Sequence, residues 1–182
     1  MDNELIEPSD TDDLNQNTTK TNSKTKRLIY TDLVLMATLI IVIILDQLSK
    51  YTIKSQFNLY ESWPEIGIFR IYHTYNTGTA FGLLQGQTIL LIVASLIALI
   101  FLIYIYNEYT KGNIILRIAL GLQLGGAISN LSDRLAFGAV TDFISVGWWP
   151  VFNIADSSIV VGITILISGI LYREKISKVI EK

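Results

Sequence analysis

Two aspartates, Asp142 and Asp156, lie fourteen residues apart in a stretch of the chain that is otherwise almost free of charge. Asp156 is the only charged residue between Asp142 and Arg173. A carboxylate in or beside membrane hydrocarbon is costly, so such a residue usually has a function. When two carboxylates are held close together, they share one proton. The ionised one can then take a proton from water while the protonated one polarises a carbonyl. This pair could therefore hydrolyse a peptide bond without a metal or a cysteine.

Further polar residues are expected at the same level of the membrane, because they map to one end of the apolar segments or to the loops beside that end. Helical spacing places Asn130 on one face with Asp133 and Arg134, and Asn153 on one face with Asp156. A channel or pump would carry ionisable groups across the whole depth of the bilayer. The grouping at one level instead predicts a reaction at that surface, with the candidate residues Asp46, Lys50, Asn76, Asn130, Asp133, Arg134 and Asn153.

Composition excludes several other kinds of site. The chain has 182 residues, no cysteine and a single histidine, His73. Thiolate metal sites, disulfides and a cysteine nucleophile are therefore excluded, and one histidine argues against catalytic zinc. We expect neither a metal nor another cofactor. The formal net charge of -2 gives no indication of nucleic-acid binding.

The elements that must position the polar residues are four apolar segments, each near the length that crosses ~30 Å of hydrocarbon. We expect them to form one membrane domain over residues 28–175. Asp46 is expected near one end of the first segment, whose uncharged part is short. Gly121 and Gly125 form a G-x-x-x-G pair in the third segment, which indicates close helix packing. The predicted spans are residues 28–48, 88–106, 113–133 and 151–172.

Both ends of the chain are polar. Residues 1–27 contain few large apolar side chains and are predicted to form a disordered tail, and residues 176–182 form a basic C-terminus. Basic residues lie before the first span, in the loop at Lys111 and after the last span, so the positive-inside rule places both termini in the cytoplasm. The polar candidates then lie near the extracytoplasmic face. There the roughly alternating segment 65–76 predicts a β-strand.

Four motifs in this order resemble those of the lipoprotein signal peptidase (signal peptidase II) family, bacterial inner-membrane aspartic peptidases. Together they cover the chain from the first span to the last. Two positions depart from the family pattern, with Ser129 and Thr79 in place of the usual Gly and Ala, and neither touches the aspartate pair. The motifs are DQLSK (46–50), NTGTAFG (76–82), GGAISNLSDRLAFGAVTDFISV (125–146) and FNIADSSIVVG (152–162).

The resemblance implies an integral membrane, mainly α fold, in which four transmembrane helices carry a small extracytoplasmic β-cradle lying on the membrane. It implies a diacylglyceryl prolipoprotein substrate, cut just before its lipidated cysteine by the catalytic pair Asp142 and Asp156. Membrane lipid is the other expected partner, nucleic acid is not expected, and we expect a monomer. Carried over by motif, the residues that line or brace the site are Asp46, Lys50, Asn76, Asn130, Asp133, Arg134 and Asn153.

The segment between the first two spans is expected to cover the site. Residues 57–84 are rich in aromatic side chains and contain glycines near one end, a composition suited to an amphipathic cover. Such elements commonly exclude water from an active site. We expect this segment to lie over Asp142 and Asp156, with Asn76 reaching the substrate backbone.

Simpler interpretations stay open for individual residues. Asp133 beside Arg134 fits a structural ion pair better than chemistry. Asp46 and Lys50, spaced i and i+4, fit an ordinary helix-end salt bridge equally well. His73 is expected on the surface of the cradle.

Two other function classes also stay open. The aspartates Asp142 and Asp156 could hold helix ends in a non-enzymatic transporter or assembly factor, although the charge at mid-bilayer depth typical of a transporter is absent from the sequence. A serine peptidase could use Lys50 as base and Ser49 or Ser132 as nucleophile, but this leaves both aspartates unexplained.

Overall fold

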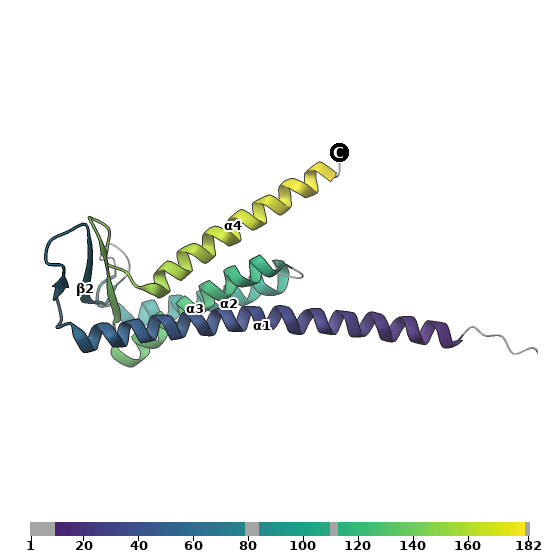
Figure 1. Cartoon of the computed structure of the whole chain (residues 1–182), viewed down its shortest axis with the longest axis horizontal. Helices are drawn as coiled ribbons and strands as arrows, with labels where there is room; N and C mark the ends of the chain where they lie inside the picture. Colours follow the sequence, from purple (N-terminus) through teal and green to yellow (C-terminus); the bar gives the residue numbers. More distant parts are fainter. Residues whose placement is uncertain (1–9, 79–83, 110–112, 181–182) are drawn as a thin grey trace, which may run out of the picture.

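The computed structural model is a bundle of four long helices with a small β-sheet at one end, and α4 is inclined away from α1 (Figure 1). It describes residues 10–78, 84–109 and 113–180, and the side chains of residues 33–78, 84–106 and 113–172. The predicted fold class, a mainly α membrane protein with four spanning helices and a small sheet, is confirmed. In chain order the elements are α1 (Asp10–Gln56), β1 (Ser62–Trp63), β2 (Phe69–Asn76), α2 (Thr88–Tyr109), α3 (Ile114–Phe137), β3 (Val140–Val146) and α4 (Ile154–Ile180).

Each predicted span has a counterpart in a helix that is long and apolar enough to cross a membrane. The first differs most from its prediction, because it covers Leu33–Gln56 rather than residues 28–48. Asp46 and Lys50, which were expected to mark its end, are fully buried inside the protein and therefore do not interrupt it. The other three spans are Thr88–Tyr106, Ile114–Phe137 and Ile154–Tyr172.

The N-terminal segment differs from its prediction of disorder, and both polar ends of the chain carry helix. The helix α1 begins at Asp10, so residues 10–27, for which composition predicts disorder, are helical. A helix that the apolar span has already nucleated extends at the cost of one ordered residue for each hydrogen bond gained, which favours its continuation. In the same way α4 continues to Ile180, through most of the basic segment predicted for residues 176–182. The first nine residues lie outside the described part of the chain.

The central helix of the bundle is α3, which contacts α1, α2 and α4. Its glycines bring it close to two of these neighbours. A Cβ atom on Gly125 would lie 2.8 Å from the carbonyl oxygen of Leu39 in α1, and one on Gly126 would lie 2.5 Å from the carbonyl oxygen of Ala155 in α4. The G-x-x-x-G pair therefore packs as predicted, and a further glycine fixes the distance to α4.

The bundle is divided along its length. A cluster of buried apolar side chains fills the half that is remote from the sheet, whereas buried polar side chains fill the half beside the sheet. The polar half lies where the ends of α1 and α3 meet the beginning of α4. The apolar core consists of Leu35, Leu102, Leu116, Ala119, Leu120, Leu124 and Leu166.

The sheet has three antiparallel strands in the order β1-β2-β3. The predicted strand at residues 65–76 corresponds to β2, and β3 follows directly after α3. In the register between β2 and β3, Thr74 is paired with Asp142 and Asn76 with Val140. This register brings the end of β2 beside Asp142.

His73 does not lie on the surface of the sheet, so that prediction is wrong. Its side chain is only 4% exposed, and Nδ1 lies 2.9 Å from the carbonyl oxygen of Phe57, just after α1. The ring also packs edge to face against Tyr75. The alternating pattern of the strand predicts which residues share a face, but the loop after α1 covers one face and buries His73.

Candidate functional site

Asp142 is the third residue of β3, and it is buried between β2 and the start of α4. Its Oδ2 accepts a hydrogen bond of 2.9 Å from Asn76 Nδ2, and its Oδ1 accepts one of 2.7 Å from Asn153 Nδ2. Burial of the carboxyl group, reinforced by the charge of Asp156, raises the pKa of Asp142 to about 7, although the bonds from Asn76 and Asn153 and the charge of Lys50 oppose the shift. Asp142 can therefore carry a proton near neutral pH.

Asp156 lies in the first turn of α4, where its spacing from Asn153 forms a reciprocal cap. The Asp156 backbone N–H donates to Asn153 Oδ1 at 2.8 Å, and the Asn153 backbone N–H donates to Asp156 Oδ2 at 3.2 Å. This is the arrangement of a capping box, with the i, i+3 spacing that it requires. The remaining oxygen, Asp156 Oδ1, accepts from Asn130 Nδ2 at 2.8 Å.

Asn153 joins the two aspartates. It is fully buried, and its side-chain amide bonds Asp142 while its backbone N–H bonds Asp156. The carboxyl groups that are fourteen residues apart in the sequence are thus held by one residue, and the like charge of Asp156 contributes to the raised pKa of Asp142. The geometry has the features of a coupled carboxyl pair.

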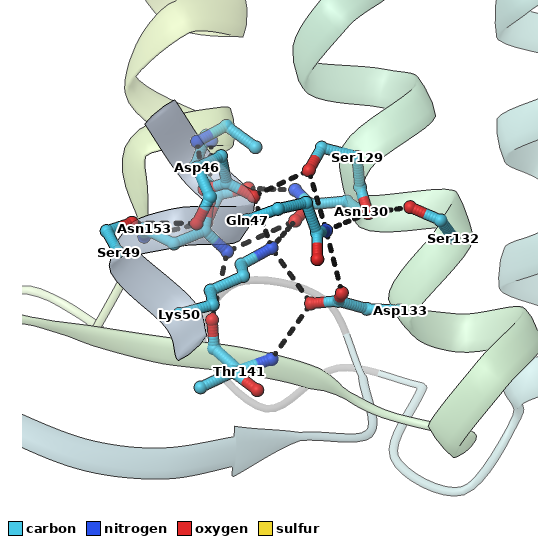
Figure 2. Close-up of polar contacts among 12 residues, drawn as sticks. Asp46, Gln47, Ser49, Lys50, Ser129, Asn130, Ser132, Asp133, Thr141 and Asn153 are labelled. Carbon is cyan, nitrogen blue, oxygen red and sulfur yellow. Dashed lines mark hydrogen bonds and ion pairs between the residues drawn. The ribbon is translucent and has the colours of Figure 1, made fainter. Parts of the chain in front are cut away.

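Behind the pair lies a buried charged cluster, which we define as Asp46, Lys50 and Asp133 (Figure 2). Lys50 Nζ lies 2.6 Å from Asp46 Oδ2 and 2.9 Å from Asp133 Oδ2, and it donates to Asn130 Oδ1 at 2.9 Å. All three side chains of the cluster are at most 2% exposed. The i, i+4 salt bridge between Asp46 and Lys50 is therefore present, but it is buried inside the bundle rather than at an exposed helix end.

The carboxylates of this cluster are tied to each element around them. Asp46 accepts from the hydroxyl of Ser129 in α3 at 2.7 Å and from the backbone N–H of Ala155 in α4 at 2.8 Å. Asp133 accepts from Gln47 Nε2 at 3.0 Å and from the backbone N–H of Thr141 at 3.4 Å. The cluster thus fixes α1, α3, α4 and β3 to one another.

Among the described side chains, Asp133 forms its ion pair with Lys50 and none with Arg134, so the expected pairing of these neighbours is wrong. Consecutive helix residues point in different directions, which separates them. Arg134 faces Asp142 and Asp156, and its Nη2 lies 3.5 Å from the carbonyl oxygen of Gly78. Its buried Nε has no hydrogen-bond partner within the described residues.

A cavity of about 310 Å³ adjoins the carboxyl pair. Polar groups from β2, α3 and the first turn of α4 form one side, and apolar residues from the loop before α4 and from α4 form the other. Such a mixed lining suits a ligand that has both peptide and apolar parts. The lining residues are Asn76, Gly78, Arg134, Trp149, Pro150, Val151, Phe152, Asp156, Ile159 and Val160.

The serine alternative has no geometric support. Ser49 Oγ donates to the carbonyl oxygen of Asp46 at 2.7 Å, and Ser132 Oγ donates to that of Ser129 at 2.7 Å, so both hydroxyls bond the backbone of their own helices. Lys50 Nζ contacts Asp46, Asp133 and Asn130, one acceptor for each of its three N–H groups, and in the described contacts it bonds neither serine hydroxyl. In the described part of the chain, no three His, Asp or Glu side chains are arranged to hold a metal ion.

The sequence did not identify two residues that brace the buried charged cluster behind the site. Gln47 donates to Asp133 and to Ser129 Oγ, and Ser129 donates to Asp46. Ser129 stands where the family pattern has Gly, and its fully buried hydroxyl donates to Asp46 Oδ2 at 2.7 Å. Gln47 and Ser129 are polar residues that lie close to charged residues within otherwise apolar spans, and this pattern could have identified them. The other departure, Thr79, lies outside the described residues.

Known proteins resemble this chain in sequence and in fold. Residues 38–172 match the family described as Signal peptidase (SPase) II. Lipoprotein signal peptidases from Moorella thermoacetica and Halothermothrix orenii are similar, at 43% and 41% identity over 70% and 75% of this chain and over 85% and 94% of their own. A bacterial membrane enzyme solved in meso at 2.3 Å resolution is 32% identical, with a TM-score of 0.71 over 76% of this chain and 87% of its own.

Proposed function

Because this chain belongs to the signal peptidase II family, we propose that it is a membrane-embedded aspartic endopeptidase that removes the signal peptide from diacylglyceryl-modified prolipoproteins, cleaving just before the lipidated cysteine. The observation that carries the proposal is a pair of carboxyl groups, the buried Asp142 and the half-buried Asp156, held by Asn153 beside a cavity of about 310 Å³. The chain is a multi-pass protein of a bacterial inner membrane.

In the proposed reaction, one carboxyl group of the pair is ionised and the other is protonated. The ionised group takes a proton from water as the water oxygen bonds to the scissile carbonyl carbon, and the protonated group gives its proton to the carbonyl oxygen. The resulting diol then returns a hydroxyl proton to the carboxyl group that protonated the carbonyl oxygen. As the C–N bond breaks, the carboxyl group that took the proton from water gives it to the leaving amine of the cysteine. Both carboxyl groups thereby return to their starting states.

The orientation in the membrane follows from charge and aromatic positions. We propose that both termini are cytoplasmic and that the active site lies near the extracytoplasmic face, because the basic flanking residues favour this direction. Trp148, 82% exposed, and Trp149 follow β3 at the same end of the bundle as the site, where indole rings anchor at an interface. The chain would act as a monomer in contact with membrane lipid, without a cofactor.

The direct test is cleavage by the purified protein in detergent. Incubation with a diacylglyceryl prolipoprotein should release the signal peptide, and mass spectrometry of both products should place the cut before the lipidated cysteine. A cut elsewhere, or no cut under conditions in which the protein is folded, would contradict the proposal.

The rate of cleavage should fall as pH rises through about 7, because the proton on Asp142 is then lost. Since the pair needs one proton, kcat/KM is expected to fall about tenfold for each pH unit above this value. A rate that stays constant up to pH ~9 would contradict a shared proton with a pKa of about 7.

Thermal stability must be measured at each pH as a control. The raised pKa means that the folded protein binds this proton more tightly than the unfolded chain. The free energy of unfolding therefore falls as pH rises from about 4 to about 7, and part of any loss of activity in this range could reflect unfolding. The catalytic effect is the one that persists after correction for the folded fraction.

Asn76→Ala should reduce kcat by roughly tenfold to a hundredfold while leaving the fold intact. Asn76 donates to Asp142 Oδ2 at 2.9 Å and also lines the cavity, so the variant loses a bond to the reacting pair rather than core packing. Leaving a buried acceptor without its partner costs about 1–3 kcal/mol, which covers this range of rates. Kinetics and thermal unfolding should be measured together.

The neighbouring exposed residue provides the control, since Thr77→Ala removes a similar volume beside the site. It should behave like the wild type. Wild-type kinetics in Asn76→Ala would place the segment 57–84 away from the chemistry, and a loss of activity that only follows a loss of stability would make Asn76 structural.

A further inference from the structure

The buried cation Lys50 is connected to the reacting pair through one amide, that of Asn130 in α3. Lys50 Nζ donates to Asn130 Oδ1 at 2.9 Å, and Asn130 Nδ2 donates to Asp156 Oδ1 at 2.8 Å. An ammonium group has donors only, so the atom of Asn130 that faces it must be the oxygen. The NH₂ group of Asn130 is therefore directed at Asp156, and Figure 2 shows Lys50 and Asn130 in this contact.

The side chain of Lys50 is enclosed by acceptors. Asp46 and Asp133 contact its Nζ at 2.6 Å and 2.9 Å, and the three side chains are at most 2% exposed. Three acceptors thus match the three N–H groups of the ammonium. Because all three N–H groups are paired and the side chain has no access to water, Lys50 keeps its contact with Asn130.

The two aspartates differ in what surrounds them. Asp156 receives the Asn130 amide and the backbone N–H of Asn153, and it lies at the N-terminus of α4, where a helix favours a negative charge. Asp142 lies in a strand and receives only neutral side-chain amides. One of these, from Asn153, also contacts the carbonyl oxygen of Thr141 at 3.4 Å.

We propose that Lys50 is a positioning residue for peptide cleavage, which through Asn130 keeps Asp156 as the ionised member of the pair and leaves the shared proton on Asp142. This inference rests on the proposed aspartic mechanism and deepens it. Asp156 then takes the proton from the attacking water as the new C–O bond forms, and Asp142 protonates the carbonyl oxygen.

Other charged groups face the pair and must be distinguished from Lys50. Arg134 of α3 acts on both aspartates, and Asp46 of α1 acts on Asp156. The charge of Lys50 also reaches both members of the pair through space. The contact through Asn130 distinguishes the two aspartates, because Asn130 Nδ2 bonds Asp156 directly. It reaches Asp142 only through Asn153, whose Nδ2 lies 3.1 Å from Asn130 Oδ1 and 2.7 Å from Asp142 Oδ1.

The test is the pH profile of kcat/KM for Lys50→Met. Without the ammonium, the Asn130 oxygen keeps only one of its two donors, Asn153 Nδ2 at 3.1 Å. The Asn130 amide is then held less firmly with its NH₂ group toward Asp156, which disfavours the ionised base. The acid limb of the profile should therefore move to higher pH by about one unit, and the alkaline limb should move less, so that the profile narrows. An unchanged profile, or an equal shift of both limbs, would overturn the inference and leave Lys50 a structural or merely electrostatic residue.

Gln47→Leu is the matched control. Gln47 lies on the same helix and bonds Asp133 and Ser129, but it does not bond Asn130. Its loss should lower thermal stability without narrowing the pH profile. If Gln47→Leu also narrows the profile, general loosening of the buried cluster explains the effect, and the inference fails.

A second variant keeps the test decisive if Lys50→Met does not fold. Lys50→Met combined with Asp133→Asn removes one charge of each sign, so the net charge of the cluster is unchanged. It should narrow the profile in the same way. Asp142→Asn and Asp156→Asn are assayed beside it: cleavage by either would refute the aspartic mechanism itself, whereas a wild-type profile in an enzyme that needs both aspartates refutes only the role of Lys50.

Discussion

Asp142→Asn and Asp156→Asn should each lower turnover by at least ~10⁴-fold while the protein stays folded. Asparagine has nearly the shape of aspartate, but it can neither take a proton from water nor give one to a carbonyl. Asp142 accepts two hydrogen bonds, and an amide oxygen can keep at least one of them. The measurement is the initial rate on a diacylglyceryl prolipoprotein, together with thermal unfolding in the same detergent.

Because the two aspartates act as one unit, the double variant should be little worse than either single variant. Glu65→Gln makes the same chemical change at an exposed position before β2 and should cleave like the wild type. Full activity in either single variant would end the assignment of the aspartic pair.

Precursor without the diacylglyceryl group should be cleaved at least ~100-fold less efficiently, measured as kcat/KM on two precursors that differ only in that group. Part of the cavity beside Asp156 is lined by Ile159 and Val160, and Val160 is 63% exposed on the surface that α4 presents outside the bundle. Each buried CH₂ group adds about 0.8 kcal/mol, which is available to hold the scissile bond in place.

The position of the lipid can be tested on α4. Val160→Ser should reduce cleavage of the lipidated precursor and leave the slow cleavage of the unlipidated one unchanged. Leu171→Ser, at an equally exposed position toward the far end of the same helix, is the control and should affect neither. Equal efficiency on both precursors would contradict a role for the lipid in positioning.

The sequence predicts the parts of this protein that depend on local pattern. Hydropathy identifies the four spans, and the strand at residues 65–76 follows from alternation. The spacing of Asn153 and Asp156 correctly places both at the start of one helix, and their reciprocal cap explains why. Each of these features depends only on residues that are close together in the sequence.

The rest depends on contacts between segments far apart in the sequence. The bond from Gln47 to Ser129 joins residues 82 positions apart, and the one from Ala155 to Asp46 joins residues 109 apart. A hydropathy profile places the end of a span at Asp46, because the profile contains no information on the contacts through which α3 and α4 satisfy the Asp46 oxygens. For the same reason Asp133 pairs across the bundle with Lys50 rather than with its neighbour in sequence.

The close approach of α3 to its neighbours limits how this enzyme can be engineered. Replacing glycine by alanine within helices is a common way to raise heat resistance, because it restricts the unfolded chain. Here a methyl group on Gly126 would meet the carbonyl oxygen of Ala155 at 2.5 Å, and one on Gly162 would meet that of Ala119 at 2.6 Å. Both changes would push α4, and Asp156 with it, away from α3. Substitutions that raise thermal stability must therefore be sought on the lipid-facing surface of the helices rather than at these two glycines.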